Sequence, residues 1–350
     1  MNIYFLGIPE VMISHPGISV MKEEADEIVS YLLKNNLVEK KLKIHQNGNY
    51  VCIPVRAQPG YLIGNMEVAR YDFSTRINGR NPYEEILGIL EKSGMNGSSV
   101  PKRWITYGDS VILKFLDNTE QIKSIAKAFM EVLKCKSVYE MKGGVRGRNR
   151  IPRVKLVAGK GGETRHLENG VIYVFDPERI MYSPGNVNER HHFLRLIRGG
   201  DTVIDMFAGI GYFSLQIARH TDAARVYCMD INPEAIRFLE KSASVNGLSQ
   251  YVEAMVGDCR VTKPELRGDL VFMGNFSSID YIIHGIQRLR SGGGIIAHFL
   301  VSSEEIDTYS DRINYMIRRL GRRSSVEDLH RVKSYAPNLW HMSAYIRITG

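Results

Sequence analysis

The sequence predicts an α/β fold with a doubly wound, mainly parallel sheet in its C-terminal half. A short apolar segment at 203–205 leads into a glycine loop and then into a helical pattern. The segment 225–230 is a second apolar strand that ends in an acid, and a third short strand ends just before Asp258. Strands that alternate with helices and carry polar residues at their carboxyl ends are typical of open parallel sheets with a ligand at that edge.

The glycine loop is the feature around which the chain is organised, with the order Asp-Met-Phe-Ala-Gly-Ile-Gly over residues 205–211. Backbone N–H groups converge at such a strand-to-helix turn, and glycine lets a ligand lie against bare backbone. Asp230, about 20 residues further on, is placed to bind two ribose hydroxyls. A nicotinamide dinucleotide site would need a third glycine where Ser214 stands, so we expect another nucleoside ligand. An unrelated α/β domain is the alternative.

Composition sets broader limits. A chain of 350 residues is long enough for two or three domains, and its formal net charge of +8 favours a polyanionic partner such as nucleic acid over a merely basic protein. Four scattered cysteines without C-x-x-C spacing predict neither a disulfide framework nor a zinc site, so we expect a reducing cytoplasm. We expect no signal peptide, and no membrane span either, since no apolar run approaches the roughly 18 residues that a span needs.

Three domains are expected along the chain. Residues 1–100 should form a small α+β unit and a linker, with helices at 21–33 and 82–92 and a hairpin around Asn47-Gly48. Residues 101–165 should form a second α+β unit that binds nucleic acid, with a strand at 109–115 and a helix at 121–133. Residues 166–350 should form the ligand-binding domain.

The segment 142–165 is the most charged part of the chain, with eight cations and one acid. Its glycines predict an open loop, and a solvated basic loop is one interpretation. A phosphate-binding surface is favoured because arginine dominates and its fork fits phosphate oxygens. The residues expected to contact RNA are Arg146, Arg148, Arg150, Arg153 and Lys155.

A polar run immediately before the glycine loop predicts a second part of the site. A strand follows Gly170, and Gly185-Asn186 predicts a turn into a helix. This turn suits a zwitterionic amino-acid tail, with Ser183 as a donor and Arg190 as the partner of a carboxylate. A purely structural turn is the alternative.

At this point the chain resembles a known family. The motifs are His-x-Glu-Asn-Gly at 166–170, Ser-x-Gly-Asn-x-x-Glu-Arg at 183–190, and Asp-x-Phe-Ala-Gly-x-Gly-x-Phe at 205–213. Their order is similar to that in the enzymes that modify the purine 3′ of the tRNA anticodon, namely the tRNA (guanine-N1)-methyltransferase and wybutosine-synthesizing protein 2. The resemblance covers roughly 103–350.

The resemblance implies a class I S-adenosylmethionine-dependent transferase, with a Rossmann-like sheet closed by an antiparallel hairpin at 325–349. It also implies contacts to S-adenosylmethionine at sites carried over from the family's motifs. These residues are Ser183, Arg190, Asp205, Phe207, Gly209, Gly211, Asp230, Asp258 and Cys259. In that pattern, Asp258 lies against the adenine amine.

Two departures from the methyltransferase pattern resemble the wybutosine branch. Gly274 stands where the methyltransferase has the asparagine of Asn-Leu-Pro, and Gly185-Asn186 stands where it carries bulkier residues. The resemblance thus implies transfer of the 3-amino-3-carboxypropyl group to a tricyclic wybutosine precursor in tRNA(Phe), leaving 5′-methylthioadenosine. The alternatives are N1-methylation at the same position and a non-catalytic tRNA-binding protein.

The chemistry that this function requires is modest. All three carbons on a sulfonium are electrophilic, so the enzyme selects a product by presenting one of them to the base. Glu189 or Asn275 could assist removal of a proton from the attacked base. We expect no metal requirement, and we expect a monomer.

Overall fold

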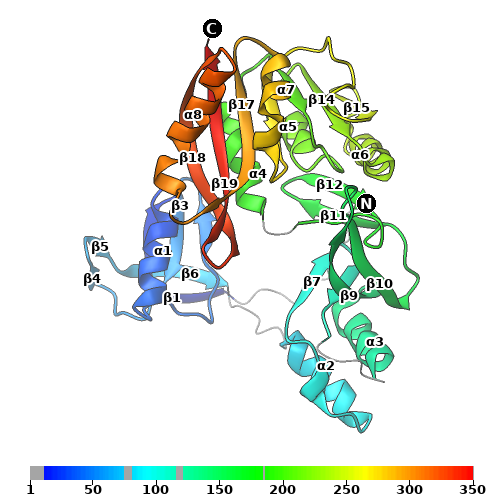
Figure 1. The fold of residues 1–350 in the computed structure, drawn as a ribbon. Coiled ribbons are helices and arrows are strands. Elements are labelled where there is room, and N and C mark those ends of the chain that lie inside the picture. Colours follow the sequence, from blue (N-terminus) through cyan, green and yellow to red (C-terminus); the bar gives the residue numbers. More distant parts are fainter. Residues whose placement is uncertain (1–11, 75–80, 116–120, 184–185, 350) are drawn as a thin grey trace. The chain divides into compact units, whose positions relative to one another are not determined.

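The computed structural model describes residues 12–74, 81–115, 121–183 and 186–349, and the chain divides into two compact units, Met1–Gly88 and Ile89–Gly350 (Figure 1). Each unit has its own apolar core. Among the described residues, no helix combines the length and the apolar character needed to cross a membrane.

The first unit contains a four-stranded antiparallel sheet in the order β2-β3-β1-β6 and one helix packed in its core. The hairpin predicted at Asn47-Gly48 is confirmed, and Gly48 has a φ of +60°. The predicted helix begins later than expected, because residues up to Met21 pair as a strand. The elements are β1 Met12–Met21, α1 Ala25–Lys34, β2 His45–Asn47, β3 Tyr50–Pro54, β4 Leu62–Ile63, β5 Met66–Glu67 and β6 Ala69–Ser74.

The second unit begins with a smaller sheet in the order β10-β9-β8-β7, to which α3 adds a buried face. The predicted strand at 109–115 and helices at 82–92 and 121–133 are confirmed, with small shifts at their ends. The elements are α2 Pro82–Lys92, which spans the boundary, η1 Gly97–Ser99, β7 Trp104–Tyr107, β8 Ser110–Leu113, α3 Ile122–Leu133, β9 Ser137–Arg146 and β10 Ile151–Gly159.

The prediction of an open basic loop over 142–165 is wrong. Most of this segment forms the antiparallel hairpin β9–β10, whose turn covers only 147–150. The partly buried Val154 and Leu156 alternate with the exposed Arg153 and Lys155, which is the pattern of a strand with one covered face. The glycines that suggested a loop are tolerated because the hairpin is anchored at its buried end, at Val138.

A seven-stranded sheet in the order β15-β14-β13-β16-β17-β19-β18 forms the centre of the second unit. Neighbours from β15 to β17 are parallel, whereas β19 pairs antiparallel with both β17 and β18. This arrangement confirms the predicted fold class, including the C-terminal hairpin. The chain order reverses between β13 and β16, and ligands of such sheets bind at that switch point.

Both faces of this sheet are covered. One face packs with β12, α5 and α6 in a core that includes Phe238 and Phe272, and the other packs with α7 and α8 around Ile313 and Ile317. Figure 1 shows α8 alongside β18. The elements are β11 Thr164–Glu168, β12 Val171–Phe175, α4 Val187–His192, η3 Phe193–Leu196, β13 Thr202–Asp205, α5 Ser214–His220, β14 Arg225–Asp230, α6 Pro233–Val245, β15 Val252–Val256, β16 Gly268–Met273, η4 Ser278–Tyr281, α7 Ile282–Gln287, β17 Leu289–Ser302, η5 Ile306–Thr308, α8 Tyr309–Arg319, β18 Arg323–Ala336 and β19 Leu339–Thr349.

Candidate functional site

A cavity lies in the second unit at the carboxyl ends of β13, β14 and β16, where the switch point predicts a ligand. It also receives side chains from the β9–β10 turn, α4, β18 and β19. Ten of the predicted site residues line it. These are Arg148, Arg150, Ser183, Arg190, Phe207, Gly209, Asp230, Asp258, Cys259 and Asn275.

Gly209 shapes the floor of the cavity. Its φ is +55°, and a Cβ at this position would lie 2.6 Å from the Tyr212 ring. Its backbone N–H donates to Asp230 Oδ2 at 2.8 Å. Because this donor is already engaged by a carboxylate, it is not presented to an anionic ligand, which agrees with a nucleoside that carries no phosphate.

Asp205 and Gly211, the first and last residues of the loop, do not line the cavity. Asp205 is 1% exposed and accepts hydrogen bonds from Ser214 Oγ at 2.6 Å and from the backbone N–H of Phe207 at 3.2 Å. Burial raises the pKa of Asp205 to about 7. Ser214, which replaces the third glycine of a dinucleotide site, is thus the partner of a buried carboxyl group that holds the loop.

The two carboxylates at the next strand ends have opposite surroundings. Asp230 is part-buried and accepts the backbone N–H of Asn232 at 2.9 Å, and burial raises its pKa. Asp258 accepts from Arg260 at 2.6 Å and from Arg148 at 2.9 Å, and the Arg260 contact holds its pKa well below the usual range. Asp258 therefore stays ionised and reaches the cavity with arginines on its carboxylate.

The loop that carries Asp258 and Cys259 is held from below by Arg288, which sequence reasoning missed. Arg288 is 3% exposed and donates to the backbone carbonyl groups of Cys259, Thr262 and Lys263 at 2.6 to 3.2 Å. Hydrogen bonds from one buried guanidinium to three backbone carbonyl groups hold this loop in place. Burial raises the pKa of Cys259 to about 11, so its thiol stays protonated at neutral pH.

Arg190 is a buried cation that lines the cavity. It is 1% exposed, donates to Glu168 Oε1 at 2.5 Å and to the backbone carbonyl of Ser183 at 2.8 Å, and packs over the Tyr182 ring. Glu168, the glutamate of the His-x-Glu-Asn-Gly motif, is therefore explained by its ion pair with a buried arginine. The Nε of Arg190 has no hydrogen-bond partner among the described residues.

Lys333, from β18, is a cavity residue that sequence reasoning did not assign. Its Nζ donates to Asn186 Oδ1 at 2.7 Å and lies 3.5 Å from Ser183 Oγ, and both partners are neutral. Burial, followed by the nearby Arg190 and Arg150, lowers its pKa. The only signal in the sequence was its place in the C-terminal hairpin that the resemblance implies at 325–349. Pro184 and Gly185 of the predicted turn lie outside the described residues.

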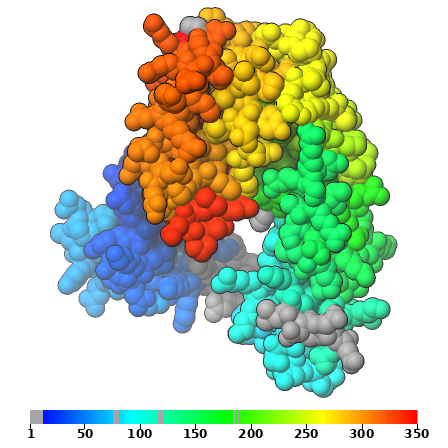
Figure 2. All heavy atoms as spheres, in the orientation of Figure 1, coloured from blue at the N-terminus to red at the C-terminus, as the bar shows by residue number. Residues whose placement is uncertain are grey.

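The predicted RNA-binding residues separate into two groups. Arg148 and Arg150 are in the β9–β10 turn and reach the cavity, where Arg150 lies over the Phe276 ring. The other three are exposed on the strands of the hairpin and do not line the cavity: Arg146, Arg153 and Lys155. In Figure 2 the green part of the second unit, which includes this hairpin, is at the surface that faces the viewer.

The two predicted catalytic residues are also separated. Asn275 lines the cavity, and its Oδ1 accepts from the backbone N–H of Ser277 at 3.0 Å. Glu189 is 3% exposed, does not line the cavity, and lies 2.7 Å from His330 Nε2 and 3.4 Å from His298 Nε2. Burial alone would raise the pKa of Glu189, but these histidines outweigh it and lower the value to about 2.

Comparison with known proteins connects this geometry to a family. Residues 164–327 match the family described as the TRM5/TYW2 methyltransferase domain. Residues 84–162 match the TYW2 N-terminal domain, and residues 17–62 match the tRNA methyltransferase 5 N-terminal domain.

Individual relatives agree. The chain is 30% identical over 259 residues to a tRNA(Phe) (4-demethylwyosine(37)-C(7)) aminocarboxypropyltransferase of Pyrococcus horikoshii, covering 71% of this chain and 90% of the relative. It is 26% identical over 341 residues to the tRNA (guanine(37)-N(1))-methyltransferase Trm5b of Pyrococcus abyssi, covering 95% and 99% of the two chains. The structure of P. horikoshii TYW2 in complex with MeSAdo superposes with a TM-score of 0.68 at 27% identity, covering 76% of this chain and 99% of that one. The chain therefore belongs to the TRM5/TYW2 family.

Proposed function

We propose that this protein transfers the 3-amino-3-carboxypropyl group of S-adenosylmethionine to the tricyclic wybutosine-precursor base 3′ of the anticodon in tRNA(Phe), releasing 5′-methylthioadenosine. The aminocarboxypropyltransferase relative supports this activity. Gly274 supports it too, because it stands where the methyltransferase carries the asparagine of Asn-Leu-Pro. The observation that carries the proposal is that the lining of one cavity combines carboxylates at the strand ends with the cations Arg190 and Lys333.

The residues present fit S-adenosylmethionine. Asp230 would hold the ribose hydroxyls beside the loop at Gly209, and the segment at Asp258 and Cys259 would face the base. The methionine end would lie against Ser183, Arg190 and Lys333. Lys333 has neutral hydrogen-bond partners, and Arg190 keeps an unpartnered Nε, so both retain capacity for a carboxylate.

When bound, S-adenosylmethionine supplies a sulfonium whose attached carbons are electrophilic. The protein's contribution is to orient it so that the carbon bearing the aminocarboxyl end faces the base. A cation near the cavity wall suits this orientation, because the transferred group itself carries the carboxylate. Gly274 lies close to Phe272 and Phe213, since a Cβ there would be 3.0 Å and 3.5 Å from those rings, so the loop passes near them without a side chain. Asn275 and Glu189 are proposed to assist proton removal.

The nucleic-acid surface is proposed at the exposed face of the β9–β10 hairpin. The three exposed cations Arg146, Arg153 and Lys155 would contact phosphates, and the net charge of +8 favours the same partner. Arg148 and Arg150 would bridge this surface and the cavity. The four described cysteines are free and buried, which supports a cytoplasmic enzyme.

Isotope labelling tests the reaction. With tRNA carrying the precursor base, label in the methionine carbon chain should enter the RNA, label in the methyl group should not, and methylthioadenosine should be released. Lys333→Met should slow transfer without loss of folding, and Arg318→Met, an exposed cation on α8, is the matched control. Methyl label in RNA together with S-adenosylhomocysteine would contradict the proposal.

The same experiment identifies the alternative, tRNA (guanine-N1)-methylation. One observation favours this alternative: residues 17–62 match the N-terminal domain of tRNA methyltransferase 5, and the Trm5b relative aligns over 95% of this chain. The aminocarboxypropyltransferase aligns over 71% of it, at higher identity. We infer that the first unit contributes to tRNA binding, whereas the cavity determines which carbon of the cofactor is transferred.

A further inference from the structure

Six titratable side chains form a continuous series from the cavity wall to the surface of the second unit. They come from β19, β17, α4 and β18, which lie far apart in the sequence. In order from the cavity they are His341, His298, Glu189, His330, Asp328 and His192.

The inner part of the series is buried. His341 lines the cavity and is 1% exposed, and its Nε2 lies 2.8 Å from His298 Nδ1. His298 is also 1% exposed, and its Nε2 lies 3.4 Å from Glu189 Oε1. The remaining ring nitrogen of His341, Nδ1, has no partner among the described residues. Buried polar atoms without partners are costly, so this atom requires an explanation.

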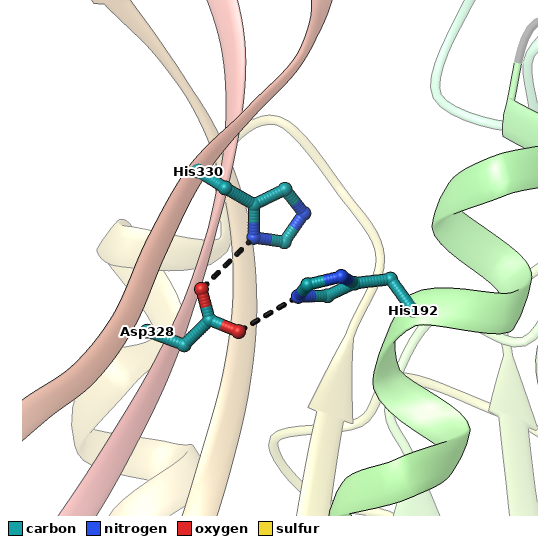
Figure 3. A group of neighbouring side chains, drawn as sticks. All are labelled: His192, Asp328 and His330. Carbon is teal, nitrogen blue, oxygen red and sulfur yellow. Dashed lines mark hydrogen bonds and ion pairs between the residues drawn. The ribbon is translucent and has the colours of Figure 1, made fainter. Parts of the chain in front are cut away.

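The outer part reaches solvent. Glu189 Oε2 lies 2.7 Å from His330 Nε2, and His330 Nδ1 lies 3.3 Å from Asp328 Oδ1. Asp328 Oδ2 lies 2.7 Å from His192 Nε2, and Figure 3 shows His192 and His330 on either side of this carboxylate. These three side chains keep between 21% and 26% of their surface exposed.

A metal site is the other arrangement that two histidines and an aspartate suggest. Here, however, Arg195 donates to Asp328 Oδ2 at 2.8 Å and lies 2.9 Å from His192 Nε2. A guanidinium at the atoms that would bind an ion takes the place of that ion. The outer group is therefore interpreted as a hydrogen-bonded network.

Two contacts indicate which ring nitrogens carry protons. One is the hydrogen bond between His341 and His298, and the other is the ion pair of His298 Nε2 and Glu189 Oε1 at 3.4 Å, in which neither atom makes a hydrogen bond among the described residues. Glu189 Oε1 faces His298 Nε2, so an ionised carboxylate favours a proton on that nitrogen. His298 Nδ1 is then an acceptor, and His341 Nε2 must be the donor to it. This assignment leaves His341 Nδ1, a buried atom of a residue that lines the cavity, with a lone pair and no partner among the described residues.

We propose that this series removes the proton that the attacked base loses during the proposed transfer and conducts it to solvent. The bond between the base and the transferred carbon forms while the bond from that carbon to sulfur breaks, and its electron pair stays on sulfur. The proton of the base passes to His341 Nδ1, and the Nε2 proton of His341 passes to His298 Nδ1. The Nε2 proton of His298 passes to Glu189. Glu189 gives a proton to Nε2 of a neutral His330 that carries its own proton on Nδ1 toward Asp328, and His330 then releases the Nδ1 proton to water.

Among His341, His298 and His330 the basicity increases outward, whereas Glu189 between them has a pKa of about 2. Burial lowers the pKa of His341 to about 3 and that of His298 to about 4, so both are neutral and able to accept a proton in transit. The hydrogen bond to Glu189 raises the pKa of His330 above its ordinary value, with Asp328 adding to the effect. His192 packs against the His330 ring at 3.9 Å between centroids. A proton that enters at the cavity is therefore held more strongly at the outer end.

The first test is a set of glutamine variants measured in single turnovers. His341→Gln and His298→Gln should lower the rate of transfer roughly 10²-fold, as loss of a proton acceptor does, with the Kd values for S-adenosylmethionine and tRNA unchanged. His284→Gln, a histidine on α7 outside the series, is the control and should transfer at the wild-type rate. A folded His341→Gln protein that transfers at the wild-type rate would overturn the proposal.

A second variant avoids the buried sites. His330 is half-buried, so His330→Gln should fold. The wild-type rate should fall as the pH drops through the pKa of His330, because a protonated His330 cannot accept. His330→Gln should be slower at neutral pH and should lack this acidic limb. An unchanged pH profile in this variant would contradict the relay.

A third readout does not depend on activity. In the ligand-free protein, imidazole nitrogen chemical shifts should place the proton of His341 on Nε2 and leave Nδ1 bare, and Glu189→Gln should lower the pKa of His330. A proton found on His341 Nδ1 would exclude the proposed entry point.

This inference rests on the proposed function, but the two can fail separately. Release of S-adenosylhomocysteine in place of methylthioadenosine would overturn the proposed function and leave the rate losses of the histidine variants to be measured on methyl transfer. Release of methylthioadenosine at full rate by the histidine variants would overturn the relay alone.

Discussion

The two walls of the cavity are built from different kinds of contact. The wall that contains Gly209, Asp230 and Asp258 uses residues that follow strands of one sheet, each within a few positions of a strand end. The second wall, by which we mean the cationic part of the lining, combines Arg150 from a hairpin turn, Arg190 from α4 and Lys333 from β18. The first wall is encoded by short local patterns, whereas the second exists only after distant segments have packed.

The difference shows how charge is managed in the two walls. On the first wall, carboxylates accept backbone N–H groups or the arginines at Asp258. On the second wall, Arg190 is neutralised by the buried Glu168, whereas Lys333 has neutral partners. A ligand with a neutral nucleoside end and a carboxylate end matches this division.

The largest effect is expected for the buried ion pair of the cationic wall. Glu168→Ala should destabilise the protein by about 3–5 kcal/mol, because it leaves the Arg190 guanidinium buried without its carboxylate. Glu163→Ala, which removes an exposed partner of Lys241, should cost less than about 1 kcal/mol. Denaturant unfolding measures both, and equal losses would show that the cationic wall is no more sensitive than the surface.

The next effect concerns the carboxyl group at the start of the glycine loop. The pKa of Asp205 is about 7 in the folded protein, above its ordinary value of 3.8. The folded state therefore binds more protons between about pH 4 and 7, and this group's contribution to stability falls as the pH rises, by on the order of 4 kcal/mol. Asp205→Asn should remove that part of the pH dependence in melting curves. A variant with the wild-type dependence would show that Asp205 is ionised in the folded protein.

The nucleoside wall is tested through binding. Asp230→Ala should weaken S-adenosylmethionine binding by roughly 1.5–3 kcal/mol, as the loss of hydrogen bonds to a charged group does. Asp222→Ala, an exposed acid near the other end of the same strand, should leave the affinity unchanged. Calorimetry on the folded proteins decides, and equal affinities would remove Asp230 from the site.

The smallest effects should separate the two groups of hairpin arginines. Arg153→Ala should reduce the slope of log K against log[salt] for tRNA by about 0.9 for a duplex phosphate contact, with unchanged cofactor affinity. Arg148→Ala should alter the slope and also the cofactor affinity, because Arg148 contacts Asp258. If both variants change only the slope, Arg148 belongs to the RNA surface alone.

Local patterns predicted the sheet and the first wall well. The strand Arg225–Asp230 and the helix Pro82–Lys92 match their predicted ranges, because apolar runs and acidic first turns mark such elements. The role of Asp205 was less predictable. The sequence does not show that its carboxyl group accepts a hydrogen bond from Ser214, nine residues further on, instead of facing the ligand.

Long-range pairs could not be predicted from one sequence. Glu189 and His330 are 141 residues apart, and Lys333 and Asn186 are 147 apart. No local period links such positions, and isolated histidines at 298 and 341 look like core residues of two strands. The alternation of apolar and charged residues in β10 is visible in the sequence, but the glycines of 142–165 favoured the prediction of a loop.

The position of β19 has a consequence for how the protein is made. This strand lies between β17 and β18, and it follows every other strand of the seven-stranded sheet in chain order. During synthesis, earlier segments fold first, yet β18 has no neighbour in the sheet until β19 has been translated and inserted. Lys333 and His341 pair directly across these two strands. Lys333, which belongs to the second wall, can therefore take its place in the sheet only after β19 has been translated and has paired with β18.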